Sequence, residues 1–409
     1  MDSHGIARSS RPRTEEQRQQ QLEKIRRYRE LEESVRQKIK SREYTRETFD
    51  ITSKLLRLNP EYYTIWNVRR RCLKSSFFYT SSSGPSHSKD SRTSGPSATP
   101  TPSSAASSTS PSVATPSTPE DQPIGKNGTT LEAGASPEDA EMQDKDIIAS
   151  ELMFTVPLLM QYPKCYWLWN YRLWILQQAV ERLRAPVARA IWEEELGLVG
   201  KMLHRDQRNF HAWGYRRGVI AQLESSALAG HSMVEPEFAY TTQMIHKDLS
   251  NFSAWHNRGQ LIPRLLDERK ADDAARRELL DKELALAYDG LNVGPEDQSL
   301  WYYLQYLMLN VIDSKTDRCF TPNLTTETRT EIISETIANI RDLLEDYTDI
   351  KWIYESLIEY TLALAQVQDR KASIEEREDL TSWLQTLRRL DPKRAGRWSD
   401  FEKNLALYF

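Results

Sequence analysis

The chain has few of the residues that metal and disulfide modules need. Its 409 residues include three cysteines, Cys72, Cys165 and Cys319, which lie too far apart to resemble a disulfide framework or a zinc module. No HExxH or CxxC motif is present, the seven histidines are scattered, and the 15 glycines form no phosphate-binding loop. These absences predict reduced thiols, no metal or cofactor held by this chain, and no independent catalytic centre.

Long apolar runs and a strong net charge are also missing. No stretch approaches the roughly 18 apolar residues that a membrane span requires, and the N-terminal residues MDSHGIARSSRPRTEEQRQQQ lack the apolar core of a signal peptide. Lysine and arginine number 55 against 59 acidic residues, and the net charge of −4 argues against a dedicated nucleic-acid binder. We therefore expect a cytoplasmic protein with no membrane span and no nucleic-acid partner.

One long segment has almost no apolar side chains. Between Thr80 and Pro123 the only large one is Val113, and the rest is mostly serine, threonine and proline. Such a stretch buries too little apolar area to offset an ordering entropy of about 1–2 kcal/mol per residue. We interpret 78–144 as a disordered insertion, which separates an N-terminal helix and first repeat (1–77) from the remaining repeats (145–409).

The chain does contain a short motif that recurs around tryptophan. Successive copies centred on Trp169, Trp213, Trp255 and Trp301 lie 44, 42 and 46 residues apart. The seven copies are NPEYYTIWNVRR (59–70), YPKCYWLWNYRLW (162–174), RNFHAWGYRR (208–217), NFSAWHNR (251–258), GPEDQSLWYYL (294–304), YTDIKWIYE (347–355) and DPKRAGRWSDF (391–401).

The columns around the tryptophan indicate a pair of helices joined by a turn. Apolar residues before each motif follow the helical period, and proline six residues before Trp66, Trp169 and Trp301 marks the break between the helices. We expect each tryptophan to pack its own pair against the next one. The pattern predicts an all-α fold, a right-handed α-α superhelix of about seven helix pairs with a concave face.

Arginine stands three residues after the tryptophan in four copies, at Arg69, Arg172, Arg216 and Arg258. A guanidinium beside an aromatic stripe must reach a carboxylate, a carbonyl or solvent. Bridging between helices of this chain fits the pattern, and so does a groove that faces a partner or an anionic ligand. We take the four arginines as candidates for a partner groove on the concave face.

The motif N/D-P-x-x-Y-x-x-W-N-x-R resembles the repeats of protein prenyltransferase α subunits. The resemblance covers Thr14–Phe77 and about 145–409. The segments RNFHAWGYRR (208–217) and DQSLWYY (297–303) and the early helix at 15–35 resemble the α subunits of the Rab-type (type II) geranylgeranyltransferases. The α subunit shared by farnesyltransferase and type I geranylgeranyltransferase is an alternative, as is a helical-repeat scaffold that belongs to no enzyme.

This resemblance implies a heterodimer in which the helix pairs of this chain form a crescent around a β subunit. The β subunit is expected to hold zinc, the geranylgeranyl diphosphate pocket and most of the chemistry. The reaction transfers geranylgeranyl to C-terminal cysteines of Rab GTPases that an escort protein presents. This chain would then be the α subunit, inactive without its β subunit.

The same resemblance assigns roles to individual side chains. Lys164 would face the diphosphate, where a lysine neutralises charge on the leaving group. Tyr166, Asn209 and His211 are expected at the rim of the partner's active site, and His4 is a candidate for reaching the partner's zinc.

Overall fold

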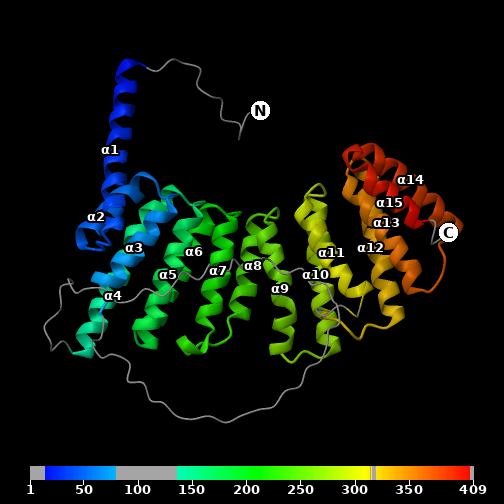
Figure 1. Cartoon of the computed structure of the whole chain (residues 1–409). Helices are drawn as coiled ribbons and strands as arrows, with labels where there is room; N and C mark the ends of the chain where they lie inside the picture. Colours follow the sequence, from blue (N-terminus) through cyan, green and yellow to red (C-terminus); the bar gives the residue numbers. More distant parts are fainter. Residues whose placement is uncertain (1–13, 80–135, 314, 316–318, 406–409) are drawn as a thin grey trace, which may run out of the picture. The chain divides into compact units, whose positions relative to one another are not determined.

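The computed structural model describes residues 14–79, 136–313, 315 and 319–405, and within them every regular element is a helix (Figure 1). None of these helices combines the length and the apolarity that crossing a membrane requires. The elements are α1 (Glu15–Lys40), α2 (Arg46–Leu58), α3 (Tyr63–Ser76), α4 (Pro137–Gln161), α5 (Tyr166–Arg182), α6 (Ala185–Arg205), α7 (Phe210–Leu223), η2 (Ser226–Leu228), α8 (Val234–Lys247), α9 (Phe252–Glu268), α10 (Asp273–Val293), α11 (Gln298–Ile312), α12 (Thr326–Asp346), α13 (Lys351–Val367), α14 (Ile374–Leu390), η3 (Pro392–Arg394) and α15 (Ala395–Leu405).

The helices follow one another as pairs after α1. In the described residues, α1 is followed by seven successive pairs, from α2 and α3 to α14 and α15. Partners such as α6 and α7 or α8 and α9 contact each other, and the second helices α9, α11 and α13 also contact their neighbours in turn. The expected all-α class and repeat of about seven pairs are confirmed, whereas the right-handed turn and the crescent stay predictions.

Contacts divide the chain into two compact units. The first comprises Met1–Leu158 with Asn170–Leu183, and the second comprises Leu159–Trp169 with Arg184–Phe409. The helices α4 and α5 therefore contribute residues to both units. Each unit is described by itself below.

A tight turn joins the two helices of a pair. After α6, the backbone N–H of Asn209 donates to the carbonyl of Asp206 at 3.2 Å, and the Asn209 side chain then caps α7 by accepting from the N–H of Ala212. After α8, Asn251 repeats both roles, with Asp248 as its turn partner. An asparagine at this position satisfies an N–H that the first helical turn leaves without a partner.

The tryptophan of the motif fixes the same turn from inside. In five copies the indole N–H donates to the carbonyl of the residue six positions earlier, at 2.7–2.9 Å, and each of these rings is at most 4% exposed. The donor and acceptor pairs are Trp66 and Pro60, Trp169 and Pro163, Trp213 and Gln207, Trp255 and Leu249, and Trp301 and Pro295. The ring thus fills the core and also satisfies a turn carbonyl.

In the sixth copy of the motif, the buried aromatic residue lies two positions after the tryptophan that the sequence suggests. Tyr354, not Trp352, occupies the buried position there, and its hydroxyl donates to the carbonyl of Thr348, six residues earlier, at 2.8 Å. Trp352 is half-buried and packs edge-on against Tyr302. Tyrosine can replace tryptophan because it also combines a large ring with a donor at its tip.

The predicted insertion extended too far toward the C-terminus. Residues 80–135 lie outside the described residues, but 137–144 form the first turns of α4. Asp144 is buried there and accepts from the backbone N–H of Tyr79 at 2.9 Å. This turn of α4 was missed because its sequence, PEDAEMQD, is polar and resembles the preceding segment.

We predict that Trp255→Phe lowers the free energy of unfolding by about 1–3 kcal/mol, because the Leu249 carbonyl loses its donor and the smaller ring leaves space. Trp352→Phe, at a half-buried ring, should change it by less than about 1 kcal/mol. Urea denaturation followed by circular dichroism measures both. Equal losses in the two variants would contradict the role given to the indole N–H.

Candidate functional site

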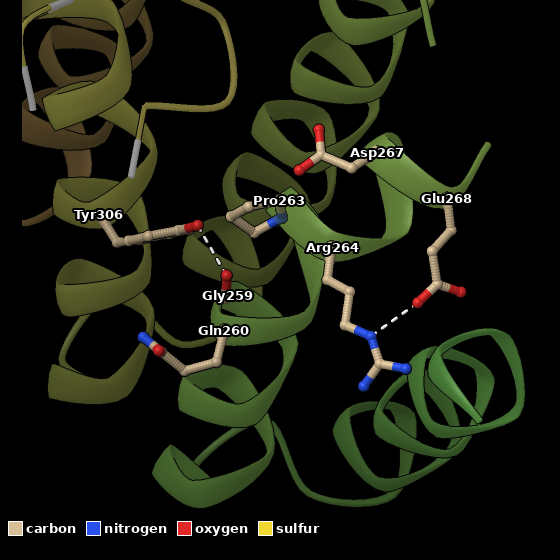
Figure 2. Close-up of a pocket in the computed structure, with 7 residues that line it drawn as sticks. All are labelled: Gly259, Gln260, Pro263, Arg264, Asp267, Glu268 and Tyr306. Carbon is tan, nitrogen blue, oxygen red and sulfur yellow. Dashed lines mark hydrogen bonds and ion pairs between the residues drawn. The ribbon is translucent and has the colours of Figure 1, made fainter. Parts of the chain in front are cut away.

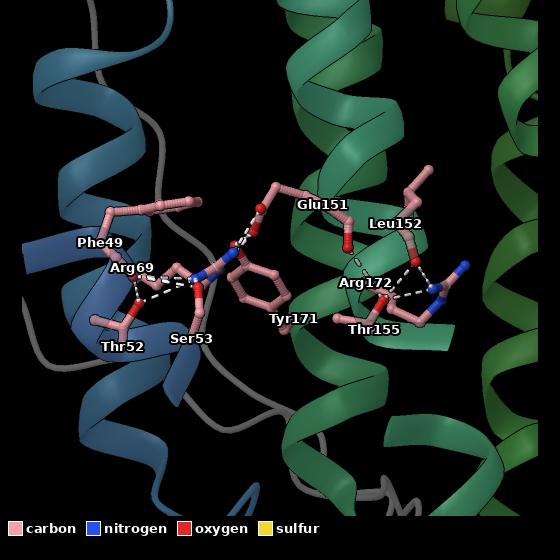
Figure 3. A network of polar contacts seen from close by, with 9 residues as sticks. All are labelled: Phe49, Thr52, Ser53, Arg69, Glu151, Leu152, Thr155, Tyr171 and Arg172. Atoms are coloured by element: carbon pink, nitrogen blue, oxygen red, sulfur yellow. Dashed lines mark hydrogen bonds and ion pairs between the residues drawn. The ribbon is translucent and has the colours of Figure 1, made fainter. Parts of the chain in front are cut away.

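The candidate residues include four motif arginines, and the first of these lies inside the first unit. Arg69 of α3 meets Glu151 of α4 in a two-pronged ion pair, from Nε to Oε2 at 2.6 Å and from Nη2 to Oε1 at 2.7 Å (Figure 3). Its remaining nitrogen, Nη1, donates to the hydroxyls of Thr52 and Ser53. Both charged side chains are almost completely buried.

A tyrosine completes this arrangement. The Tyr171 hydroxyl donates to Glu151 Oε2 at 2.5 Å, so the carboxylate is held from two sides. Burial first and the charge of Glu151 second raise the pKa of Tyr171 well above its ordinary value. The hydroxyl therefore stays protonated and remains a donor. A buried ion pair that is fully hydrogen-bonded in this way avoids the large cost of an unpaired charge.

The second unit contains two more ion pairs of this kind. Arg216 of α7 donates to Glu237 of α8 at 2.9 and 2.5 Å, and Arg258 of α9 donates to Glu283 of α10 at 2.7 Å through both prongs. Tyr303 donates to Glu283 Oε2 at 2.5 Å, as Tyr171 does to Glu151 in the first unit. Each arginine follows the tryptophan of its own pair by three residues, and each glutamate precedes the next tryptophan by 18.

Where a helix pair lacks the arginine, the next pair lacks the matching glutamate. Leu304 stands at the arginine position of the fifth pair, and Thr336 stands 18 residues before Tyr354 in the sixth. Thr48 stands 18 residues before Trp66 in the first helix pair of the described residues. All three side chains are buried, so the core accepts apolar or hydroxyl groups in place of the two charges.

The assignment of Arg69, Arg172, Arg216 and Arg258 to a partner groove is therefore wrong. All four are buried, at 2–6% exposure, and Arg172 donates to the carbonyl of Leu152 and the hydroxyl of Thr155. They bridge helices within this chain, which was the other arrangement that the motif allowed. The column of glutamates, which lies a whole helix away from the tryptophan, is the signal that sequence reasoning missed.

Asn209 is also buried, which contradicts its placement at the rim of an active site. Besides capping α7, its amide nitrogen donates to the Pro163 carbonyl at 3.0 Å, and the Trp169 indole donates to the same carbonyl at 2.9 Å. Only 1% of Asn209 is exposed. Its role is to join the turns of two successive helix pairs.

The other predicted residues of this set remain on the surface of the second unit. The Lys164 side chain is 76% exposed, and its Nζ lies 3.9 Å from Asp206 Oδ2. Tyr166 is about half exposed, and its ring lies 6.3 Å from that of His211. His4 lies outside the described residues. The structure thus brings Lys164, Tyr166 and His211 to neighbouring ends of α5 and α7.

Exposed aromatic rings continue from there along the second helices. Phe210 and Phe252, each three residues before the tryptophan of its motif, are mostly exposed, and Phe252 packs edge-on against Tyr302. His256 stacks on Phe252. Burial first and the charge of Arg217 second lower the pKa of His256 below its ordinary value, so the ring is neutral at pH 7. The motif places an aromatic residue three positions before the tryptophan, but the sequence alone does not show that its ring is exposed.

Two pockets open beside these rings, between α9 and α11. One, of about 340 Å³, is lined mainly by aromatic side chains, including Phe252, His256 and Tyr302. The other, of about 590 Å³, is more polar (Figure 2). Between them the Tyr306 hydroxyl donates to the Gly259 carbonyl at 2.7 Å, and a side chain at 259 would press on the Tyr306 ring.

The charged end of the larger pocket is internally balanced. Arg264 donates to Glu268 at 2.7 Å within α9 and to both oxygens of Glu224 at 2.7 and 2.8 Å. No group of three or more metal-ligating side chains occurs among the described residues. Cys72 is buried, and burial raises its pKa to about 12, so its thiol stays protonated.

Comparison with known proteins identifies the repeat. The model of the protein prenyltransferase alpha subunit repeat matches residues 45–76, 148–179, 192–223 and 234–265, each within one of the first four helix pairs. The chain is 28% identical to the geranylgeranyl transferase type-2 subunit alpha of Saccharomyces cerevisiae, over 76% of this chain and 74% of that protein. It is 28% identical to the protein of the same name from Candida albicans, over 97% of this chain and 96% of that protein.

A solved structure shares the fold. The Candida albicans protein geranylgeranyltransferase-I complexed with GGPP superposes with a TM-score of 0.53 and 17% sequence identity, over 93% of this chain and 91% of that chain. At this identity the likeness concerns the fold alone.

We predict that Arg258→Met lowers the free energy of unfolding by about 3–5 kcal/mol, because it leaves Glu283 charged and buried without its cation. The double variant Arg258→Met/Glu283→Leu should recover most of that loss. As a matched control, Arg269→Met removes an equally two-pronged but exposed pair with Glu235 and should cost no more than about 1 kcal/mol. Urea denaturation measures all three, and a double variant no more stable than Arg258→Met would contradict the pairing.

Proposed function

Because this chain belongs to the protein prenyltransferase alpha subunit repeat family, we propose that it is the alpha subunit of a heterodimeric Rab-type, or type II, geranylgeranyltransferase. The observation that carries the proposal is the end-to-end alignment with the Candida albicans type-2 subunit alpha, which spans nearly the whole of both chains. A scaffold that shared only the general helix-pair architecture would not match both the repeat model and the full length of these proteins.

In this proposal the chemistry belongs mainly to a β subunit. That partner holds zinc and geranylgeranyl diphosphate, and a Rab GTPase arrives bound to an escort protein. The sulfur of a C-terminal Rab cysteine attacks the first carbon of the lipid, a thioether bond forms, and the carbon–oxygen bond to diphosphate breaks. The thiol proton is lost, and diphosphate leaves.

The contribution we propose for this chain at the reaction centre is a positive charge from Lys164. Its side chain is mostly exposed, and the nearest carboxylate oxygen, on Asp206, is 3.9 Å away, so the ammonium group is available to a second anion. Tyr166 and His211 lie next to each other at the same end of the second unit. A cation already in place opposite the leaving diphosphate stabilises the charge that develops there.

We predict that this chain copurifies with a type II β subunit when the two are coexpressed, and not with a β subunit of the farnesyl or type I class. The purified pair should transfer geranylgeranyl to Rab in the presence of escort protein, and this chain alone should not. The measurements are affinity copurification and incorporation of radiolabelled lipid. Binding to the farnesyl-class β subunit instead would assign the chain to the other prenyltransferases, and transfer by the chain alone would refute the division of labour.

We also predict that Lys164→Ala in the heterodimer slows the single-turnover transfer step about a hundredfold, which corresponds to about 3 kcal/mol of transition-state stabilisation. Lys164→Arg should retain more of the rate because it keeps the charge. Lys201→Ala, at another exposed lysine of the second unit, is the matched control and should leave the rate unchanged.

Single-turnover measurement at saturating lipid and Rab separates the transfer step from product release. Heterodimer formation should be the same for all three variants, since an exposed lysine contributes little to folding or assembly. A wild-type rate in Lys164→Ala with intact heterodimer would remove Lys164 from the reaction.

A further inference from the structure

The first unit carries a groove whose charge is of one sign. We call it the basic groove; it has a volume of about 420 Å³ and is lined by Ile39, Lys40, Arg42, Tyr44, Arg71, Lys74 and Ser75. It lies where the end of α1 and the turn before α2 meet the last turns of α3. Four of its side chains are cationic, and none of the lining residues is acidic.

These four cations differ from the exposed arginines that hold a carboxylate. Arg208 and Arg269, for example, each hold a carboxylate with two prongs, at Asp248 and Glu235. Among the described residues, Lys40, Arg42, Arg71 and Lys74 form no ion pair. In a chain of net charge −4, four neighbouring cations without a carboxylate are a site that an anion would stabilise.

The nearby carboxylates are held elsewhere. Glu43 and Glu47 flank the turn, and both pair with Lys38, at 3.4 and 2.8 Å from its Nζ. Lys38 thereby screens the groove from the two acidic side chains that stand closest to it in sequence. Arg71 donates to the Tyr44 hydroxyl at 2.9 Å, which steadies one guanidinium at the groove wall.

The backbone of α1 places Arg42 at this site. The helix ends with the N–H of Arg42 bonded to the Ile39 carbonyl at 3.1 Å and the N–H of Glu43 bonded to the Lys38 carbonyl at 2.9 Å. This is the Schellman arrangement, in which the residue at Arg42 takes a left-handed conformation, here with φ of 55°, and is usually glycine. A positively charged side chain therefore stands where glycine would be the easier choice for the backbone.

We propose that the basic groove binds the phosphate of a phosphorylated serine or threonine side chain supplied by residues 80–135 of this same chain. A phosphate monoester carries nearly two negative charges at pH 7 and three acceptor oxygens, which matches guanidinium and ammonium donors converging from two helices. A carboxylate offers half that charge and fewer acceptors.

The location of the segment supports this occupant. Lys74 and Ser75 line the groove, α3 ends at Ser76, and the hydroxyl of Ser76 donates to the Tyr44 carbonyl at 2.6 Å. The sequence TSSSGPSHS begins at Thr80, five residues beyond Ser75. Ten residues of chain can span at most about 33 Å, so several of these hydroxyls are within reach of the groove.

Attachment to the same chain makes a weak site effective. A tethered ligand acts at a local concentration on the order of millimolar, so binding needs little intrinsic affinity. The phosphate itself comes from ATP through a protein kinase, which transfers the terminal phosphoryl group to the hydroxyl oxygen and releases ADP and the hydroxyl proton. The groove then joins the segment to the first helix pair only when it is phosphorylated.

The test uses the full unphosphorylated chain and a fluorescent peptide of residues 79–90 that carries phosphoserine at 81–83. Fluorescence anisotropy should show binding at least about tenfold tighter than for the unphosphorylated peptide. Arg42→Gly and Arg71→Ala should each weaken binding severalfold, and Lys54→Ala, at an exposed lysine of α2, should not. Arg42→Gly suits this test because glycine readily adopts the left-handed conformation, so the fold should be retained.

Two results would overturn the proposal. The first is equal binding of the phosphorylated and unphosphorylated peptides, or phosphopeptide binding that Arg42→Gly and Arg71→Ala leave intact. The second is stronger binding to phosphatidylserine vesicles than to the phosphopeptide, lost in the same two variants, which would make the groove a membrane contact. Neither result bears on prenyl transfer, so the proposal stands or fails apart from the proposed function.

Discussion

The buried pair of an arginine and a glutamate is the interaction on which the array of helix pairs depends. Tryptophan and its turn carbonyl fix the inside of one pair, but the arginine reaches out of its own pair to a carboxylate of the next, as Arg69 does to Glu151 (Figure 3). A charge in the core tolerates only a small error in position, because an unpaired one costs several kcal/mol. The ion pair therefore sets how far and at what angle neighbouring pairs can slide within a unit.

Much of the fold could be predicted from the sequence because the repeat is local. The tryptophan, the turn and the helical period all lie within about 20 residues, and six of the seven tryptophans proved to be buried as expected. Trp352 is the exception, because Tyr354, two residues later, donates to the turn carbonyl in its place. The first turns of α4 were missed because few of their side chains are apolar, although Ala140 and Asp144 are buried.

The candidate site was predicted less well, and the reason is physical. Whether an arginine points to solvent or into the core depends on a carboxylate that lies one helix further along, and spacing within the motif does not show it. Asn209 likewise owes its burial to a carbonyl of the preceding pair, at Pro163. The Lys164 and Tyr166 side chains are more than half exposed, with an Asp206 carboxylate oxygen 3.9 Å from the Lys164 Nζ, so the roles given to them stay predictions.

The paired columns have a consequence for how such a chain can change. Each junction depends on two residues in different helix pairs, the arginine in one pair and the glutamate in the next. Junctions that lack one of these residues lack both, as at Leu304 and Thr336. The helix pairs consequently cannot exchange positions in the chain. Moving the first pair, which carries Thr48 in place of a glutamate, to the middle of the chain would strand an arginine in the core. The ion pairs thus constrain the order of the repeats. During evolution, a helix pair can be added or moved only if the arginine and the glutamate of a junction change together.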